Sequence, residues 1–137
     1  MNRQSINPAD WGLPFHMDQG QVVDGTTRTL HCSGQCDLHS DPDAEMGVGI
    51  RHPGDMRGQM GEALGNIDAI LDRAGMARDN VVSLRFFTTD IDAFLANYDV
   101  YAEWIGAAGT RPPQSLLGVS RLVFPELMVE IEAVAAA

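Results

Sequence analysis

The chain has 137 residues, of which 45% are hydrophobic and 20% charged, values typical of a single globular domain covering residues 1–137. Nine basic against nineteen acidic residues give a net charge of −10, so the surface repels phosphate backbones and we expect no nucleic-acid partner. All nine basic residues are arginines, which excludes enzymes that form a Schiff base through lysine.

Residues 1–20 are polar but contain large apolar side chains. Leaving Trp11, Phe15 and Met17 in water is costly, so we expect an N-terminal arm that packs on the core. Residues 21–35 predict a hairpin, because a turn-forming Asp24-Gly25 pair separates two β-prone stretches. Residues 37–54, rich in acids, glycine and proline, predict a loop with at most a short strand at 47–50.

Two cysteines, Cys32 and Cys36, are too few for a disulfide scaffold or a structural zinc site. We expect both thiols to be buried and inert. No apolar run approaches the roughly 18 residues of a membrane span. These features favour the cytoplasm and predict no membrane association.

The second half of the chain alternates helical and extended patterns. Apolar residues at spacings of three and four predict a helix over 56–74 that stops at Gly75. A β-branched and aromatic stretch predicts a strand over 81–89, which leads through Asp90, a good N-cap, into a helix over 91–106. Two further strands are expected over 115–123 and 127–134, joined around Phe124-Pro125-Glu126.

This order of elements favours an α+β fold with a mixed sheet and two helices on one face. The opposite face of the sheet then has no cover within the chain. Small domains commonly bury such a face against further copies of themselves, so a homo-oligomer is expected.

Charged residues cluster at two places without matching a known catalytic or metal motif. His39, Asp41, Asp43 and Glu45 fit neither the EF-hand nor a zinc spacing, so we interpret them as a solvated loop without metal. Glu130 and Glu132 share one face of a strand. That face is either an exposed polar surface or a carboxylate at a subunit seam that activates water.

Several ordered stretches together resemble the Rid/YjgF family over residues 12–135. They are 33–35, 70–75, 81–90, 100–104, 119–122 and 129–133. The resemblance implies a chorismate-mutase-like α+β fold, assembled as a homotrimer with a central β-barrel and clefts between subunits. It also implies an enamine or imine deaminase that releases ammonia without a cofactor.

The resemblance places the substrate site on seven positions, several of which depart from the family pattern. Where the family has a substrate-clamping arginine in a Pro-Ala-Arg-Ser stretch, this chain has Pro112-Pro113-Gln114-Ser115. Leu116, Phe15 and Tyr98 replace a cysteine, a tyrosine and an asparagine of the family. The cleft glutamate is kept as Glu130, together with Ser33 and Gly34.

These residues predict a small-molecule enamine or imine hydrolase with altered specificity. Glu130 would deprotonate a water while Gln114 and Tyr98 hydrogen-bond a neutral imine, enamine or carbonyl compound. Arg85 and Arg111 are the candidates for a substitute clamp. The alternative is a non-catalytic ligand-binding or regulatory trimer, because the substitutions at the site residues are also consistent with a site that no longer catalyses a reaction.

Overall fold

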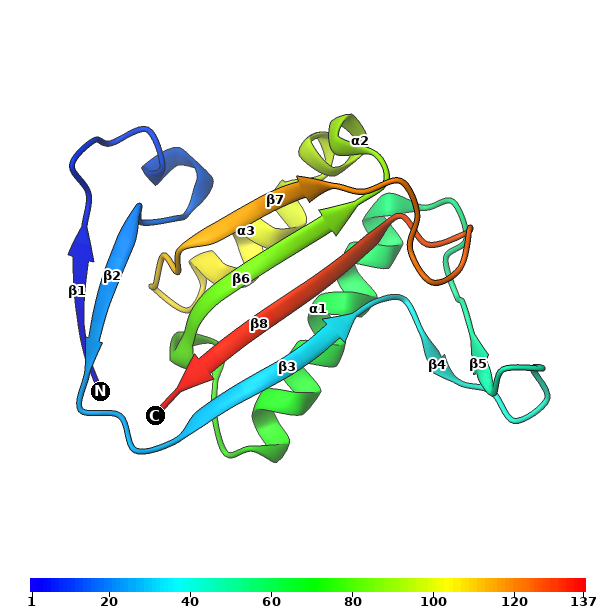
Figure 1. The fold of residues 1–137 in the computed structure, drawn as a ribbon, viewed down its shortest axis with the longest axis horizontal. Coiled ribbons are helices and arrows are strands. Elements are labelled where there is room, and N and C mark those ends of the chain that lie inside the picture. The colour runs from blue at the N-terminus through cyan, green and yellow to red at the C-terminus, as the bar shows by residue number, and fades with distance from the viewer.

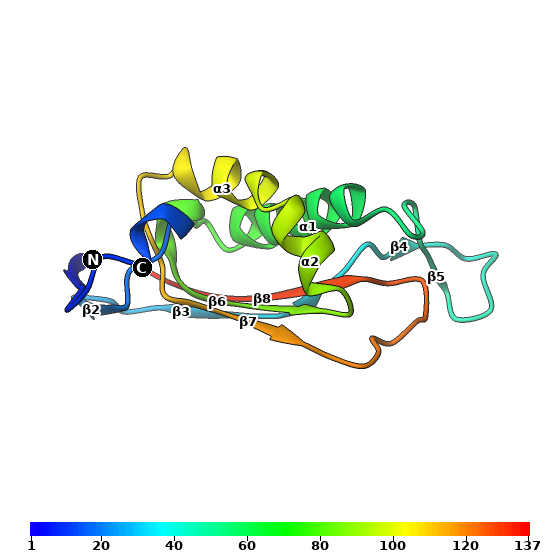
Figure 2. The same ribbon diagram turned by 90° about the horizontal axis from the view of Figure 1, so that it is seen from above.

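The computed structural model describes residues 1–137 and has a four-stranded sheet at its centre, in the order β3-β8-β6-β7 (Figure 1). The strands are β3 (Thr29–Gln35), β6 (Val81–Thr88), β7 (Gln114–Gly118) and β8 (Val129–Ala136). β6 and β7 run parallel, whereas β8 is antiparallel to both of its neighbours, so the expected mixed α+β sheet is confirmed. All three α-helices cover the same face (Figure 2).

Helix α1 (Met56–Arg73) forms where the apolar periodicity predicts it. The Asp55 carboxylate accepts a hydrogen bond from the Gly58 amide at 3.1 Å and caps the first turn. Gly75 takes a φ of +67°, the left-handed conformation that ends a helix at low cost. The buried side of α1 packs on β8 and β3 through Met60, Ala63 and Ile67, none of which is exposed.

The helix predicted over 91–106 is two helices, α2 (Ile91–Ala96) and α3 (Asp99–Gly106). The Asn97 side chain explains the break, because its Nδ2 donates to the Ala93 carbonyl at 2.9 Å. The predicted N-cap is confirmed, since the Asp90 carboxylate accepts from the Ala93 amide. Tyr98 therefore lies at a corner between two helices.

The strands predicted over 115–123 and 127–134 differ from β7 and β8 in their ends and their pairing. β7 stops at Gly118 because its partner β6 ends at Thr88, which leaves 119–123 without a strand to pair with. β8 lies on the other side of β6, so the two strands are not neighbours. The alternation of β8 is confirmed: Val129, Ile131 and Ala133 are buried under the helices, and Glu130 and Glu132 face the other way.

The hairpin predicted over 21–35 is wrong. β2 (Gly20–Asp24) pairs with β1 (Asn2–Ile6), and β3 belongs to the main sheet. Gly25 does have the positive φ of a turn, +72°, but the turn passes the chain from one sheet to the other. The arm also contains a short 3-10 helix, η1 (Leu13–Phe15).

The loop predicted over 37–54 contains only the two-residue strands β4 (His39–Ser40) and β5 (Val48–Gly49), in agreement with the short strand expected there. A second 3-10 helix, η2 (Arg78–Asn80), leads into β6. None of the helices is long and apolar enough to cross a lipid bilayer.

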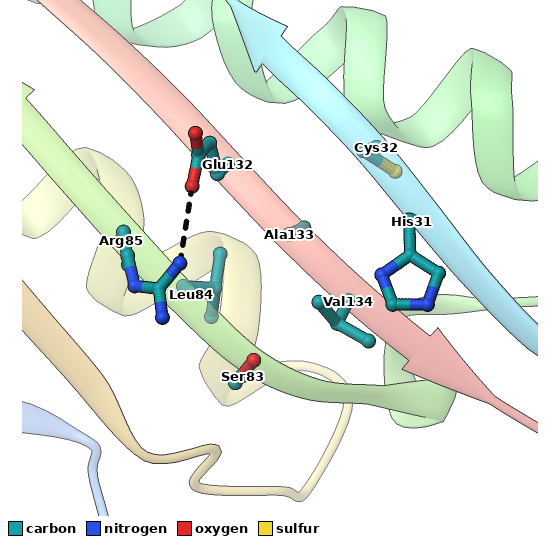
Figure 3. A pocket seen from close by; sticks show the side chains of 8 residues that line it. All are labelled: His31, Cys32, Ser83, Leu84, Arg85, Glu132, Ala133 and Val134. Carbon is teal, nitrogen blue, oxygen red and sulfur yellow. Dashed lines mark ion pairs between the residues drawn. The ribbon is translucent and has the colours of Figure 1, made fainter.

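The sheet face opposite the helices, here called the bare face, has no cover within the chain (Figure 2). It holds a shallow hollow of about 220 Å³ lined in part by His31, Ser83 and Val134. Arg85 and Glu132 lie across this hollow from one another with a nitrogen to oxygen distance of 3.5 Å (Figure 3). This uncovered face is the feature from which the sequence predicts self-association.

Candidate active site

Four of the seven site residues predicted from the sequence line one cavity on the helix side of the sheet edge: Phe15, Tyr98, Gln114 and Leu116. The cavity has a volume of about 210 Å³. We call it the aromatic pocket, and its full lining is Trp11, Phe15, Met17, Phe86, Leu95, Tyr98, Gln114 and Leu116. The arm, the corner between α2 and α3, and strands β6 and β7 thus meet there.

The side chains of Gln114 and Tyr98 hydrogen-bond to each other and to the backbone of the arm. Gln114 Nε2 donates to the Tyr98 hydroxyl at 2.5 Å and to the Phe15 carbonyl at 3.3 Å. The Tyr98 hydroxyl donates to the same carbonyl at 2.6 Å. Both side chains, which the sequence predicts to bind substrate, thus connect the arm to β7. The buried Gln114 Oε1 has no partner.

Glu130 lies on the opposite face of the sheet, beside Gly34. β3 changes register between Cys32 and Gln35, and this bulge brings the Gly34 backbone under the Glu130 side chain. A Cβ on Gly34 would lie only 2.6 Å from the Glu130 Cδ. Only glycine therefore lets the carboxylate occupy this position. Ser33 is exposed in the same bulge.

Cys36, a thiol expected to be inert, is the hydrogen-bond donor to the Glu130 side chain. Its Sγ donates to Glu130 Oε1 at 3.3 Å. Burial, the nearby Glu130 charge and the Asp37 charge raise the pKa of the Cys36 thiol to about 12. The thiol is thus protonated at neutral pH and acts as a donor to the carboxylate. Both cysteines are free and buried, as expected.

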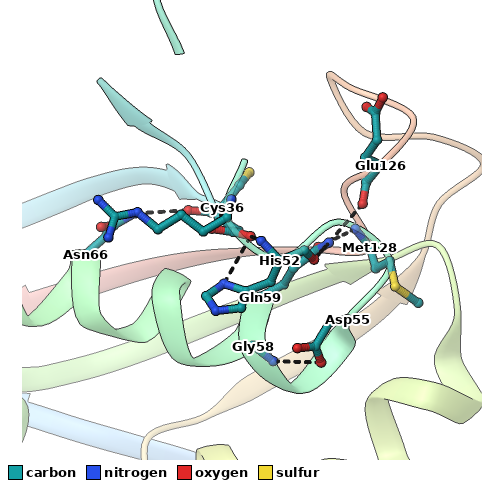
Figure 4. A network of polar contacts seen from close by, with 10 residues as sticks. Cys36, His52, Asp55, Gly58, Gln59, Asn66, Glu126 and Met128 are labelled. Carbon is teal, nitrogen blue, oxygen red and sulfur yellow. Dashed lines mark hydrogen bonds and ion pairs between the residues drawn. The ribbon is translucent and has the colours of Figure 1, made fainter. Parts of the chain in front are cut away.

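A polar network connects α1 to the chain at Cys36 and at Met128, the residue before β8 (Figure 4). Asn66 of α1 donates to the Cys36 carbonyl at 3.0 Å. Gln59, fully buried, donates to the carbonyls of His52 and Glu126 and accepts from the Met128 amide at 2.7 Å. Because these bonds join α1 to the chain on both sides, Glu130 at the start of β8 is held in place.

The aromatic pocket and Glu130 cannot meet within one chain. Leu116 is aligned with Phe86, whose side chain is buried under the helices, and Gln114 is two residues away on the same face. Glu130 is aligned with Phe87, on the other face. Alternation along the strands therefore places the two groups on opposite sides of the sheet. Any site that uses both groups needs a second copy of the chain.

Neither candidate for a substitute clamp is free in the structure. Arg111 Nε donates to Asp18 Oδ1 at 3.0 Å, and Arg85 faces Glu132 on the bare face. Asp18 also accepts hydrogen bonds from Ser5, Asn7 and Gln21, and so joins the arm to the chain before β7. Burial would raise the pKa of Asp18, but the hydrogen bonds from Gln21, Ser5, Asn7 and Arg111 outweigh it and lower the pKa to about 2.

We expect Asp18→Asn to destabilise the protein by about 2 kcal/mol at pH 7, the amount that corresponds to this lowered pKa. The ionised form is favoured in the folded state, so its contribution is complete above about pH 4 and disappears as the pH falls towards 2. Urea unfolding between pH 2 and 7 checks this. The control is Asp24→Asn, an exposed acid on β2, and an equal loss in both variants would contradict the prediction.

Sequence reasoning did not assign Trp11, Met17 and Leu95 to the pocket. The size of the two arm residues predicts that they pack on the core, but no local pattern shows which part of the core they contact. Leu95 lies within the predicted helical stripe, and that periodicity does not distinguish a residue of the pocket lining from a residue of the core.

Comparison with known proteins gives consistent matches. A family model described as Endoribonuclease L-PSP matches residues 19–137. A RutC family protein from Pyrococcus horikoshii is 35% identical over 82 residues, which are 60% of this chain and 63% of that protein. A crystal structure of the Rid family protein YyfB from Yersinia pestis, described as of unknown function, covers all of both chains with a TM-score of 0.79 at 30% identity.

TdcF from Escherichia coli is named as a candidate reactive intermediate deaminase. It is 31% identical over 84 residues, 61% of this chain and 64% of that protein. Its crystal structure with bound serine superimposes with a TM-score of 0.66 at 29% identity, over 88% of this chain and 87% of that one. The chain spans less than two thirds of the length of the curated relatives it matches.

Proposed function

The chain belongs to the Endoribonuclease L-PSP family, which is the Rid/YjgF family, and from this premise we propose that it hydrolyses small enamines or imines. The observation that carries the proposal is the half-buried Glu130 carboxylate, seated on Gly34 and held by the Cys36 thiol. A carboxylate fixed at a sheet face is suited to orient a water and accept its proton. The net charge of −10 argues against cleavage of RNA.

In the proposed reaction, Glu130 accepts a proton from a water whose oxygen adds to the carbon of the C=N bond. That proton passes to the nitrogen, which gives a carbinolamine. Glu130 then takes the proton of the new hydroxyl group and passes it to the amine nitrogen. The C–N bond breaks as the C=O bond forms, ammonia leaves and the Glu130 carboxylate is restored. Every step is an addition, an elimination or a proton transfer, so no electron carrier takes part.

We further propose that the site is completed by a second copy of the chain in a homotrimer. Glu130 and the aromatic pocket lie on opposite faces of one sheet, and the bare face has no cover within the chain. In the proposed trimer the copies pack around their bare faces, and we expect the Glu130 of one copy to lie beside the pocket of the next. The family resemblance supports the same trimer with clefts between subunits.

The proposed substrate has no carboxylate, because the pocket offers none of the charge that would hold one. Gln114 is neutral, no arginine lines the pocket, and Arg111, which precedes β7, is paired with Asp18. The assay is ammonia release from freshly generated 2-iminopropionate and from neutral imines of increasing size. We expect the neutral imines to be hydrolysed faster, and absence of ammonia release from the whole panel would contradict the proposed activity.

We expect Cys36→Ala to lower kcat/KM about three- to tenfold, because Glu130 loses its hydrogen-bond donor. Cys36→Ser keeps a donor and should retain most of the activity. A fall of equal size in both variants would mean that the thiol contributes by filling space and not as a hydrogen-bond donor.

A non-catalytic ligand-binding trimer is the second candidate function. It is favoured by the hydrogen bonds among Gln114, Tyr98 and the Phe15 carbonyl. Because these bonds occupy most of the polar atoms of the pocket, few groups are left to take part in a reaction. A compound that raises the melting temperature but is recovered unchanged would support this alternative. The two candidates thus differ in turnover, while both require the pocket to bind a ligand.

A further inference from the structure

The lining of the aromatic pocket is more apolar than that of any other cavity in the molecule. Seven of its eight residues are hydrophobic, against five of seven in the next most apolar cavity. Its rim is also apolar and faces water: the exposed fractions are 57% for Trp11, 45% for Phe15 and 47% for Leu95. Three large exposed side chains around one hollow mark a surface that an apolar group covers when bound.

The size of the pocket fits a single ring or a branched alkyl group. Its volume is about 210 Å³, and cavities of about 150 Å³ with aliphatic and aromatic walls bind benzene in other proteins. Phe15 and Tyr98 meet edge to face, with ring centroids 6.1 Å apart. A further aromatic ring adds readily to such a wall.

The chemistry of the walls excludes an anion from this pocket. The Tyr98 hydroxyl and the Gln114 amide nitrogen are already bonded to one another and to the Phe15 carbonyl. Arg111, the cation that precedes β7, is paired with the buried Asp18. A carboxylate entering the pocket would lose its hydration without gaining a charged partner, which is strongly unfavourable.

We infer that the aromatic pocket binds an uncharged apolar group, of about the size of one aromatic ring, on the imine carbon of the substrate. This inference rests on the proposed function, because it names the substrate class of that site. Gln114 then acts as a positioning residue, since it fixes the arm that supplies Phe15 and Trp11. The substrates expected are imines of aromatic or branched aliphatic aldehydes and ketones.

The test is binding of a matched pair of inert probes, para-fluorobenzyl alcohol and para-fluorobenzoate, measured by fluorine NMR on the full chain. The alcohol should bind at least about tenfold more tightly than the benzoate, because only the anion loses its hydration unpaired. Equal affinity for the two probes would overturn the inference. Absence of binding by the alcohol would also overturn it, and would mean that a side chain of a second copy fills the pocket.

Variants locate the bound probe. Leu95→Ala and Phe15→Ala should each weaken binding of the alcohol about five- to tenfold, because each removes an apolar wall. Val22→Ala is the matched control, since Val22 is 43% exposed and lies on β2, outside the main sheet and outside the lining of the pocket. If Val22→Ala weakens binding as much as Leu95→Ala, the probe does not lie in the pocket and the inference fails.

These measurements need no turnover, so they separate the inference from the proposed function. Binding of the alcohol without ammonia release from any imine would support the inferred pocket and contradict the hydrolase. Release of ammonia from 2-iminopropionate alone, with no binding of the alcohol, would support a hydrolase and overturn the inferred substrate class. Turnover of the imine of benzaldehyde together with binding supports both.

Discussion

Replacing Glu130 by glutamine is expected to lower kcat/KM for imine hydrolysis by at least about a hundredfold. Glutamine has the same shape, and its carbonyl oxygen can still accept from the Cys36 thiol, so the surroundings of the side chain are preserved. An amide, however, cannot accept the proton of the attacking water at neutral pH. Ammonia release under initial-rate conditions measures the loss.

Glu132→Gln is the matched control for this prediction. Glu132 is two residues away on the same face of β8, but its partner is the exposed Arg85, and such a surface pair contributes little to stability. We expect its activity to remain within about twofold of wild type, with an unchanged oligomeric state in both variants. Full activity in Glu130→Gln, or an equal loss in the two variants, would remove Glu130 from the proposed role.

Elements with strong local patterns could be predicted from the sequence. The stripe of α1 ends at Gly75, where the chain needs a left-handed residue, and the alternation of β8 separates Glu130 from the buried Ile131. In both cases one side of the element is buried, so the period of the apolar residues reports the structure directly.

Pairing between distant segments could not be predicted in the same way. A turn at Gly25 reverses the chain but does not choose a partner, and the polar β1, Asn2–Ile6, gives no strand signal from which its pairing with β2 follows. The break between α2 and α3 depends on one hydrogen bond from Asn97, while the apolar stripe continues past it. Tertiary contacts decide these features.

In the candidate site, too, local patterns predict some features, while others depend on contacts between distant segments. The alternation of apolar and polar residues along β8 predicts which face of the sheet Glu130 lies on. The face on which Gln114 lies follows only from its alignment with Leu84 in the parallel pair of β6 and β7. The hydrogen bond from Gln114 to the Phe15 carbonyl joins residues 99 positions apart, and no spacing in the sequence indicates it. The resemblance to the family predicts that Gln114, Tyr98 and Phe15 belong to one site. The structure shows in addition that their polar atoms hydrogen-bond to one another.

Replacing Gln114 by arginine is expected to raise kcat/KM for 2-iminopropionate by about 30- to 100-fold. The guanidinium supplies the missing positive charge and two parallel donors for a carboxylate, a pairing stronger than a neutral hydrogen bond by about 2 kcal/mol or more. The water-activating half of the site is untouched, since Glu130 lies on the other face of the sheet. Ammonia release from the carboxylated imine measures the gain.

Gln114→Leu is the control, because the arginine variant both adds a charge and loses the hydrogen bonds from Gln114 to Tyr98 and to the Phe15 carbonyl. Leucine removes the same hydrogen bonds without adding a cation. It should show no gain with 2-iminopropionate. A gain confined to arginine would mean that the native substrate lacks a carboxylate and that the chemistry of Glu130 is intact. If wild type already hydrolyses 2-iminopropionate as fast as the variant, another cation holds the acid. For Arg111 to be that cation, its guanidinium would have to leave Asp18.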